Sequence, residues 1–283
     1  MKTRSINERR RLLRGVSVLA LAAVAVPLQA QNETESAPGG FTGLLAGYLA
    51  PQALPDSLAL VPPVPAADSA AFALDLDISR RSFLLRDTAR WALANSDADL
   101  SFPHAAGTFE CALGAAVSEA ATPHLYRLLR RSLTDLGGAT YAAKTHYQRP
   151  RPFMSNEQPI CTPKDREMLL KDGSYPSGHS AAGWGWALIL TEVSPAETDA
   201  LLKRGRSFNE SRNVCNVHWY SDVVQARNVA SGTVARLHAE PEFRADLDAA
   251  RAELAVARRQ GLKPDRDCAA EGRALALQPS LSP

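Results

Sequence analysis

The sequence lacks several features that would place it in common functional classes. Its 283 residues contain four cysteines and no Cys-x-x-Cys pair, so the cysteine spacing does not match a zinc site. The formal net charge is only +2, which indicates neither a nucleic acid nor an acidic partner. No alternation of apolar and polar residues is long enough for a strand, and no internal repeat is present. What remains is an ordinary globular composition, with 45% hydrophobic and 22% charged residues.

Only the N-terminus has a long apolar run, and its pattern is that of an export signal. Basic residues precede an apolar stretch at residues 16–28, and Ala30 closes a cleavage site. The stretch is too short to span a membrane, although Leu28 is unusual three residues before cleavage, so a retained anchor stays an alternative. Residues 9–13 also resemble a twin-arginine signal, which leaves the export route open. We predict a periplasmic or secreted protein that has no membrane association after residues 1–30 are removed.

The rest of the chain predicts one all-α domain. Alanine and leucine are abundant and aromatic residues make up only 6%, which favours helices. Residues 31–67 are rich in Pro, Gly and Ala and predict an extended segment that lies on the body or is partly disordered. We expect a single compact helical domain over residues 68–265 and a C-terminal tail over residues 266–283. The expected helices include residues 77–95, 109–119, 123–136, 177–193, 195–218, 222–238 and 242–260.

The segment Ser-Arg-Asn-Val-Cys-Asn-Val-His-Trp-Tyr-Ser-Asp at residues 211–222 contains an arginine, a histidine and an aspartate. If it is helical, His218 and Asp222 share one face, one turn apart. The carboxylate could then hold one ring nitrogen protonated and leave the other as a nucleophile or base. Arg212 would add a permanently charged guanidinium, which can donate two parallel hydrogen bonds to an oxyanion. Alone, such a pair is more often a structural contact.

Two upstream motifs add cations and a backbone anion site. Lys144 and Arg151 are seven residues apart, and the prolines on both sides of Arg151 predict that it projects from an extended loop. Ser177 and Gly178 stand at a predicted helix start, where free N–H groups and the helix dipole attract anions. His179 follows in the first turn. Phosphoryl transfer requires such parts: charge neutralisation, an in-line nucleophile and a proton donor for the leaving group. No carboxylate cluster predicts a magnesium or zinc site, so we expect no metal and no cofactor.

These three motifs, Lys-x6-Arg-Pro, Pro-Ser-Gly-His and Ser-Arg-x5-His-x3-Asp, resemble in this order the signature of the type 2 phosphatidic acid phosphatase and vanadate haloperoxidase superfamily. Within it, the chain is similar to the class A bacterial non-specific acid phosphatases from about residue 71 to residue 260. The resemblance implies an acid phosphatase fold of the helical-bundle type. It also implies a role for every matching position.

By that resemblance His218 is the nucleophile that becomes a phosphohistidine, and Asp222 orients it. His179 protonates the leaving alcohol and later activates water. The phosphate oxygens are held by Lys144, Arg151 and Arg212, by the Ser177 hydroxyl and by the Ser177 and Gly178 amides. The predicted activity is metal-independent hydrolysis of small phosphomonoesters at acidic pH, with phosphotransfer to alcohols as a side activity. The natural substrate and any homo-oligomeric state stay open.

Two other functions are compatible with the same residues. A vanadate-dependent haloperoxidase would bind vanadate with the same oxyanion-binding residues. A non-catalytic phosphate-binding protein would explain the cations but not the two histidines.

An even number of cysteines in an exported protein predicts two disulfides, with buried free thiols as the alternative. Three pairings of Cys111, Cys161, Cys215 and Cys268 are open, and we favour Cys111–Cys161 because it would tie together two sides of the motif region.

Overall fold

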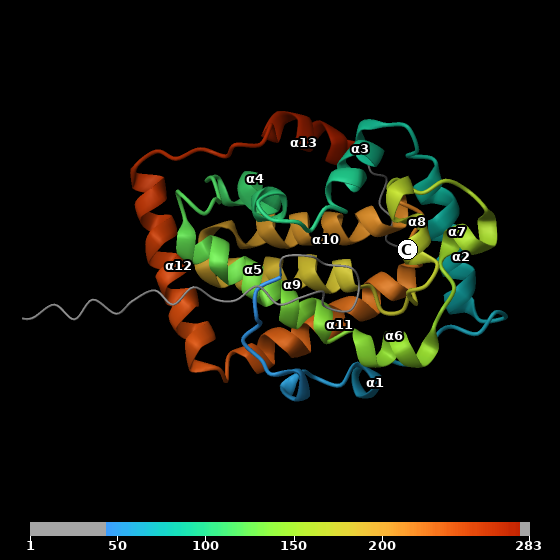
Figure 1. Cartoon of the computed structure of the whole chain (residues 1–283). Helices are drawn as coiled ribbons and strands as arrows, with labels where there is room; N and C mark the ends of the chain where they lie inside the picture. Colours follow the sequence, from blue (N-terminus) through green and yellow to red (C-terminus); the bar gives the residue numbers. More distant parts are fainter. Residues whose placement is uncertain (1–43, 278–283) are drawn as a thin grey trace, which may run out of the picture. The chain divides into compact units, whose positions relative to one another are not determined.

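The computed structural model describes residues 44–277, which form helices joined by loops (Figure 1). The predicted signal at residues 1–30 and the start of the extended segment lie outside the described residues. The α-helices are α1 Ser57–Leu60, α2 Ala70–Phe83, α3 Ala89–Ser96, α4 Glu110–Leu113, α5 Pro123–Gly138, α6 Tyr141–Tyr147, α7 Pro152–Asn156, α8 Arg166–Leu169, α9 Gly178–Val193, α10 Thr198–Val214, α11 Tyr220–Leu237, α12 Pro241–Arg259 and α13 Cys268–Ala276. Short 3-10 helices lie at η1 Pro51–Ala53, η2 His104–Phe109, η3 Pro163–Asp165 and η4 Pro195–Glu197.

The all-α prediction is confirmed, since residues 44–277 contain no strand. Within the same residues, no helix combines the length and the apolar character needed to cross a membrane. The boundaries differ from the prediction in several places. The predicted helix over residues 109–119 is reduced to the four-residue helix α4, Glu110–Leu113. Residues 77–95 do not form one helix: α2 ends at Phe83 and α3 begins at Ala89, with the left-handed Asp87 (φ 60°) between them. A further helix, α13, occupies the predicted C-terminal tail.

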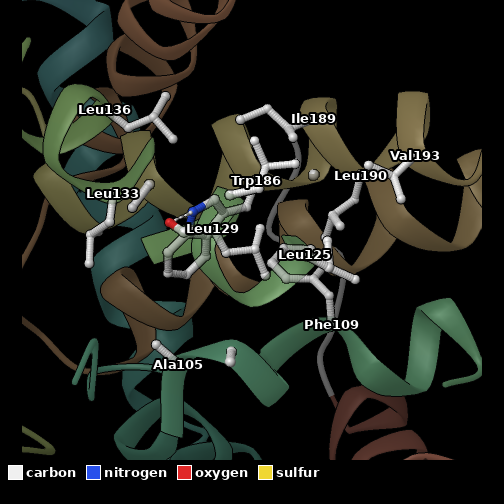
Figure 2. Packing of buried hydrophobic residues seen from close by; sticks show 14 of the residues in the cluster. Ala105, Phe109, Leu125, Leu129, Leu133, Leu136, Trp186, Ile189, Leu190 and Val193 are labelled. Carbon is white, nitrogen blue, oxygen red and sulfur yellow. Dashed lines mark hydrogen bonds between the residues drawn. The ribbon is translucent and has the colours of Figure 1, made fainter. Parts of the chain in front are cut away.

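Helix α9 packs against α5, α10, α11 and α12 (Figure 1). Its last two turns bury apolar side chains from Trp186 to Val193 against α5 (Figure 2). The indole Nε1 of Trp186 donates to the carbonyl of Leu129 at 3.0 Å, which satisfies its polar atom inside this core. Gly183 allows α10 to approach closely, because a Cβ there would lie 2.1 Å from the ring of Phe208. The first turn of α9 is therefore fixed by the packing of the rest of the helix.

The chain before α2 lies along this bundle. The backbone N–H groups of Tyr48 and Leu49 donate to the two oxygens of Asp135 on α5, at 2.9 and 3.0 Å. Ser57 at the start of α1 is buried and accepts a hydrogen bond of 2.9 Å from the backbone N–H of Ala143 on α6. Residues 44–67 therefore contact the helices on which the site depends.

Two disulfides are present, as predicted, but the favoured pairing is wrong. Cys111 on α4 bonds to Cys268 at the start of α13, with 5.3 Å between their Cα atoms. Cys161 bonds to Cys215 just after α10, with 4.7 Å between their Cα atoms. The pairing follows from tertiary packing, because α13 folds back towards α4 and the loop before η3 lies against the end of α10. The second bridge fastens that loop three residues before His218.

Candidate active site

Three separate segments of the chain meet at a cavity of about 30 Å³ beside the first turn of α9. Five of the eight predicted site residues line it: Lys144, Arg151, Gly178, His179 and His218. Arg212 lines an adjoining cavity of about 560 Å³, which shares His179 with the small one. Ser177 and Asp222 are fully buried beside it: Ser177 directly precedes Gly178, and Asp222 contacts His218. The fold thus brings all eight residues to one place.

His218 lies in the turn between α10 and α11 rather than on a helix. The predicted helix over residues 195–218 is wrong at its end, because α10 stops at Val214. Asn216 follows in the left-handed region (φ 61°), a conformation that ends helices and that asparagine tolerates. Its side chain is held by a hydrogen bond of 2.8 Å from Asn156. Asp222 stands in the first turn of α11, so the histidine and aspartate meet across a helix start.

The hydrogen bonds of His218 define its tautomer. Nη1 of Arg151 lies 3.0 Å from Nε2, and a guanidinium can only donate, so Nε2 carries the lone pair. Nδ1 therefore carries the proton, and it lies 3.3 Å from Oδ2 of Asp222. Burial lowers the pKa of His218 well below its ordinary value, and the nearby cations, Arg151 first, lower it further. A neutral imidazole with its lone pair on Nε2 is the form that a nucleophile needs.

Lys144 and Arg151 share one carboxylate, that of Asp172. Its Oδ2 accepts from Nζ of Lys144 at 3.0 Å and from Nη2 of Arg151 at 2.9 Å. Backbone carbonyls of Leu169 and Asp172 accept from Nε of Arg151, both at 3.0 Å, and fix its guanidinium. Burial, with Arg151 as the next cause, lowers the pKa of Lys144 to about 8. The two cations are therefore held in place before any ligand binds.

Arg212 differs from the other two cations because part of its guanidinium has no protein acceptor. Its side chain is buried on α10, and within residues 44–277 neither Nε nor Nη1 has a hydrogen-bond partner. Burial lowers its pKa to about 10, and Arg151 contributes. Buried donors are normally paired, so these N–H groups indicate a place for an anionic ligand.

The start of α9 supplies part of the anion site. Ser177 is the N-cap, and its Oγ accepts from the backbone N–H of Ser180 at 3.2 Å. The Ser177 backbone N–H already donates to the carbonyl of Asp222 at 3.1 Å. The hydroxyl proton of Ser177 and the amide of Gly178 can thus donate to a phosphate oxygen without breaking these bonds. A Cβ on Gly178 would meet only ordinary contacts, the nearest being Thr140 Oγ1 at 3.7 Å.

His179 stands in the same turn and contacts both cavities. Its Nε2 lies 3.0 Å from the carbonyl oxygen of Ala98, which can only accept, so Nε2 carries a proton. Burial lowers the pKa of His179 well below its ordinary value, and Arg212 is the next cause. The resting imidazole is therefore neutral, and it must gain a proton at Nδ1 before it can act as an acid.

Sequence reasoning missed two charged residues here, Asp172 and Arg149. Asp172 directly precedes the glycine of Gly-Ser-Tyr-Pro, a turn in which an aspartate is unremarkable. Arg149 stands two residues before Arg151 and contacts the carboxylate of Asp222 at 2.6 Å. Its position directly before Pro150 and close to a predicted site residue was the only available signal, because nothing local specifies its partner.

The larger cavity reaches His179 and Arg212 from the side of η2 and η3. Its lining is mixed, with side chains that include Asn95, Asp99, His104 and Lys164. It is large enough for the alcohol part of a phosphate ester, whereas the small cavity is not. Within residues 44–277, no group of three or more His, Cys, Asp or Glu side chains could hold a metal ion.

A helical fold with buried cations and two imidazoles around one cavity defines a protein that handles phosphate-like oxyanions. A family model described as the PAP2 superfamily matches residues 127–238, which contain all eight predicted site residues. The chain belongs to this superfamily and, within it, to the class A bacterial non-specific acid phosphatases.

Curated relatives cover most of the chain. It is 45% identical to a non-specific acid phosphatase of Providencia stuartii over 201 residues, which are 71% of this chain and 81% of the relative. It is 42% identical to an acid phosphatase of Zymomonas mobilis over 210 residues, 74% of this chain and 80% of the relative. A non-specific acid phosphatase of Salmonella typhimurium is 37% identical over 209 residues, 73% of this chain and 83% of that protein.

Proposed function

We propose that this chain is an exported acid phosphatase that hydrolyses small phosphomonoesters through a phosphohistidine at His218. The observation that carries the proposal is the state of His218: a buried, neutral imidazole whose Nε2 lone pair faces the cation Arg151 in the small cavity. Family membership and the names of the relatives support phosphomonoester hydrolysis. The intermediate, the site roles and export are inferences from the residues.

In the first step the phosphate is bound by Lys144, Arg151 and Arg212, together with the Ser177 hydroxyl and the Gly178 amide. Nε2 of His218 attacks phosphorus in line with the leaving oxygen, and the bond from phosphorus to that oxygen breaks. Protonated His179 gives its Nδ1 proton to the departing alkoxide, so an alcohol leaves. Asp222 stabilises the positive charge on the modified imidazole.

In the second step His179 acts as a general base and His218 is the leaving group. Neutral His179 accepts a proton from water, whose oxygen attacks phosphorus, and the bond from phosphorus to Nε2 of His218 breaks. Inorganic phosphate leaves, and the site returns to its starting state. An alcohol in place of water would yield a new phosphate ester, which is the proposed phosphotransfer side activity.

The pH dependence follows from the two depressed pKa values. His179 must be protonated to act as an acid, and its lowered pKa means that this form is populated only as pH falls. A bound phosphate dianion raises that pKa again by neutralising the nearby cations. His218 must stay neutral, and its own lowered pKa keeps it so in acid. We therefore expect the highest kcat below about pH 6.5, the ordinary histidine pKa.

The test is hydrolysis of a chromogenic aryl phosphate by wild type and His218→Ala. We expect activity of the variant to fall roughly 10³-fold or more, because the nucleophile is lost. His238→Ala is the matched control, since His238 is half-exposed and paired with Glu192 at 2.9 Å. A base-stable, acid-labile phosphate on His218 in quenched wild-type enzyme would support the intermediate. Full activity in His218→Ala would overturn the mechanism.

The same assay separates the alternatives. EDTA should leave the wild-type rate unchanged, because the side-chain cations take the role of a metal. Vanadate should inhibit; halide oxidation by peroxide with added vanadate would instead favour a haloperoxidase. Binding of phosphate without turnover of any ester would indicate a binding protein. Export is tested by N-terminal sequencing of the periplasmic or secreted protein, which should begin at Gln31.

A further inference from the structure

Behind the catalytic pair lies a second ion pair, Arg149 with Asp75, which the proposed mechanism does not use. Nη1 of Arg149 donates to Oδ1 of Asp222 at 2.6 Å, and Nη2 donates to Oδ2 of Asp75 at 2.7 Å. All three side chains are buried, with 7% of Arg149 exposed and 1% or less of each aspartate. One guanidinium thus joins two buried carboxylates, one of them the partner of His218.

The two oxygens of Asp222 have separate partners. Oδ2 accepts from the backbone N–H of Trp219 at 2.8 Å and faces Nδ1 of His218, whereas Oδ1 faces Arg149. Rotation of the carboxylate away from His218 would therefore break the bond to Arg149. The guanidinium also lies near the Trp219 ring, 5.5 Å from its centroid, which further restricts its position.

Asp75 fixes the arginine from the opposite side. It stands on α2, and its oxygens also accept from the backbone N–H and the hydroxyl of Ser221, both at 2.7 Å. Ser221 is the residue before Asp222 in the first turn of α11. Asp75 therefore fastens both Arg149 and the turn that carries the catalytic carboxylate.

We propose that Arg149, held by Asp75, is a positioning residue that keeps the carboxylate of Asp222 ionised and aimed at His218 under the acidic conditions in which the enzyme works. The proposal rests on the proposed function of His218. Arg149 is absent from the lining of both cavities, so it acts through Asp222 and not on the substrate.

Electrostatics supports this role. Burial raises the pKa of Asp222, and Arg149 is the first of the groups that lower it. The other charged or titratable groups that face this carboxylate are His218, Lys144, Arg151 and Tyr175. Lys144 and Arg151 are shared with Asp172 and, in the proposed complex, with phosphate. Arg149 is the cation that stays with Asp222 when substrate binds.

The sign of the expected effect follows from this arrangement. Without Arg149 the pKa of Asp222 rises further, so the carboxylate gains a proton at acidic pH. A protonated Asp222 no longer stabilises positive charge on His218 when phosphorus is attacked. The acid limb of the kcat profile should therefore move to higher pH in a variant that lacks the guanidinium, by about 1 to 3 pH units.

The experiment compares Arg149→Gln, Arg149→Lys and Asp75→Asn with wild type over pH 4 to 8, using an aryl phosphate. For Arg149→Gln we expect a kcat loss of roughly 10- to 100-fold at acidic pH and a KM within about twofold of wild type. Arg149→Lys retains the positive charge but cannot donate to both carboxylates as the guanidinium does. Its kcat at acidic pH should therefore lie between those of wild type and Arg149→Gln. Asp75→Asn retains Arg149 and should show a smaller shift in the same direction.

The matched control is Arg131→Gln. Arg131 is equally buried, pairs with Glu242 and donates to the carbonyl of Gly47 at 2.9 Å, away from both cavities. We expect it to lower Tm without moving the acid limb. If Arg149→Gln does not fold, Asp75→Asn decides the question by the same profile. A folded variant of either residue with a wild-type acid limb would overturn the proposal.

Different experimental outcomes would contradict the proposed function and the proposed role of Arg149. Absence of ester turnover in wild type, or full activity in His218→Ala, would overturn the function itself. An active wild type, an inactive His218→Ala and an Arg149→Gln profile equal to wild type would overturn only the role of Arg149. Inorganic phosphate affinity, measured by calorimetry, should be unchanged in folded Arg149→Gln, because Arg149 does not contact the ligand.

Discussion

The two ends of helix α9 differ in nearly every physical respect. Its first turn contains Ser177, Gly178 and His179 and lies among buried charges, whereas its last two turns lie in an apolar core (Figure 2). The apolar end stabilises the folded state by burying apolar side chains, and the polar end provides hydrogen-bond donors for an anion. One rigid helix joins the two, so the loss of one apolar side chain leaves the first turn in place in every molecule that stays folded. Stability and catalysis should therefore separate along this helix.

The largest effect should come from the polar end. His179→Ala should reduce kcat by roughly 10²- to 10⁴-fold, because the leaving alkoxide loses its proton donor. The loss should be greater with an alkyl phosphate than with an aryl phosphate that has an acidic leaving group, and Tm should change little. Rates for the two esters and a thermal melt check this. An equal loss with both esters would contradict the role of general acid.

At the apolar end, Leu190→Ala should cost about 2–5 kcal/mol in the free energy of unfolding, because a fully buried side chain leaves a cavity. The kcat per folded molecule should stay near wild type at a temperature at which the variant is folded. Urea unfolding and active-site titration measure the two quantities. A large loss of kcat in fully folded protein would show that the two ends are not separable.

Two glycines of α9 give a matched comparison of smaller size. Gly183→Ala places a methyl group 2.1 Å from the present position of the Phe208 ring, so α10 must move. We expect a cost of about 1–3 kcal/mol in unfolding free energy. Phosphate affinity should change little. Unaltered stability would mean that α9 and α10 can move apart at no cost in free energy.

Gly178→Ala should give the opposite and smallest result. The added methyl group has room in the protein, since Thr140 Oγ1 is 3.7 Å and Lys144 Cε is 4.0 Å away. We expect an unchanged or slightly raised Tm, because alanine favours helices. Phosphate should bind about tenfold more weakly, because the methyl group limits its approach to the backbone amide. Calorimetry with inorganic phosphate decides; unchanged affinity would mean that the Gly178 amide is not a ligand.

Local sequence by itself determined the helical class and most helix boundaries, and it predicted the eight positions that we propose as the site. Apolar spacing specifies α9, α11 and α12, and Pro123 marks the start of α5, because these signals act within a few residues. The three motifs could be read because each keeps its cations and histidines at a fixed spacing along the chain.

Only the tertiary structure decided which distant groups meet. The disulfide partners, the bridge from Arg149 to Asp75 and the shared carboxylate of Asp172 join segments whose separation in sequence carries no signal. The sequence also predicts the wrong end for α10, because the side-chain contacts of Asn216 decide whether that residue continues the helix or ends it. Long-range contacts are selected by packing, which local patterns do not encode, and so the supports of the site appear only in the folded chain.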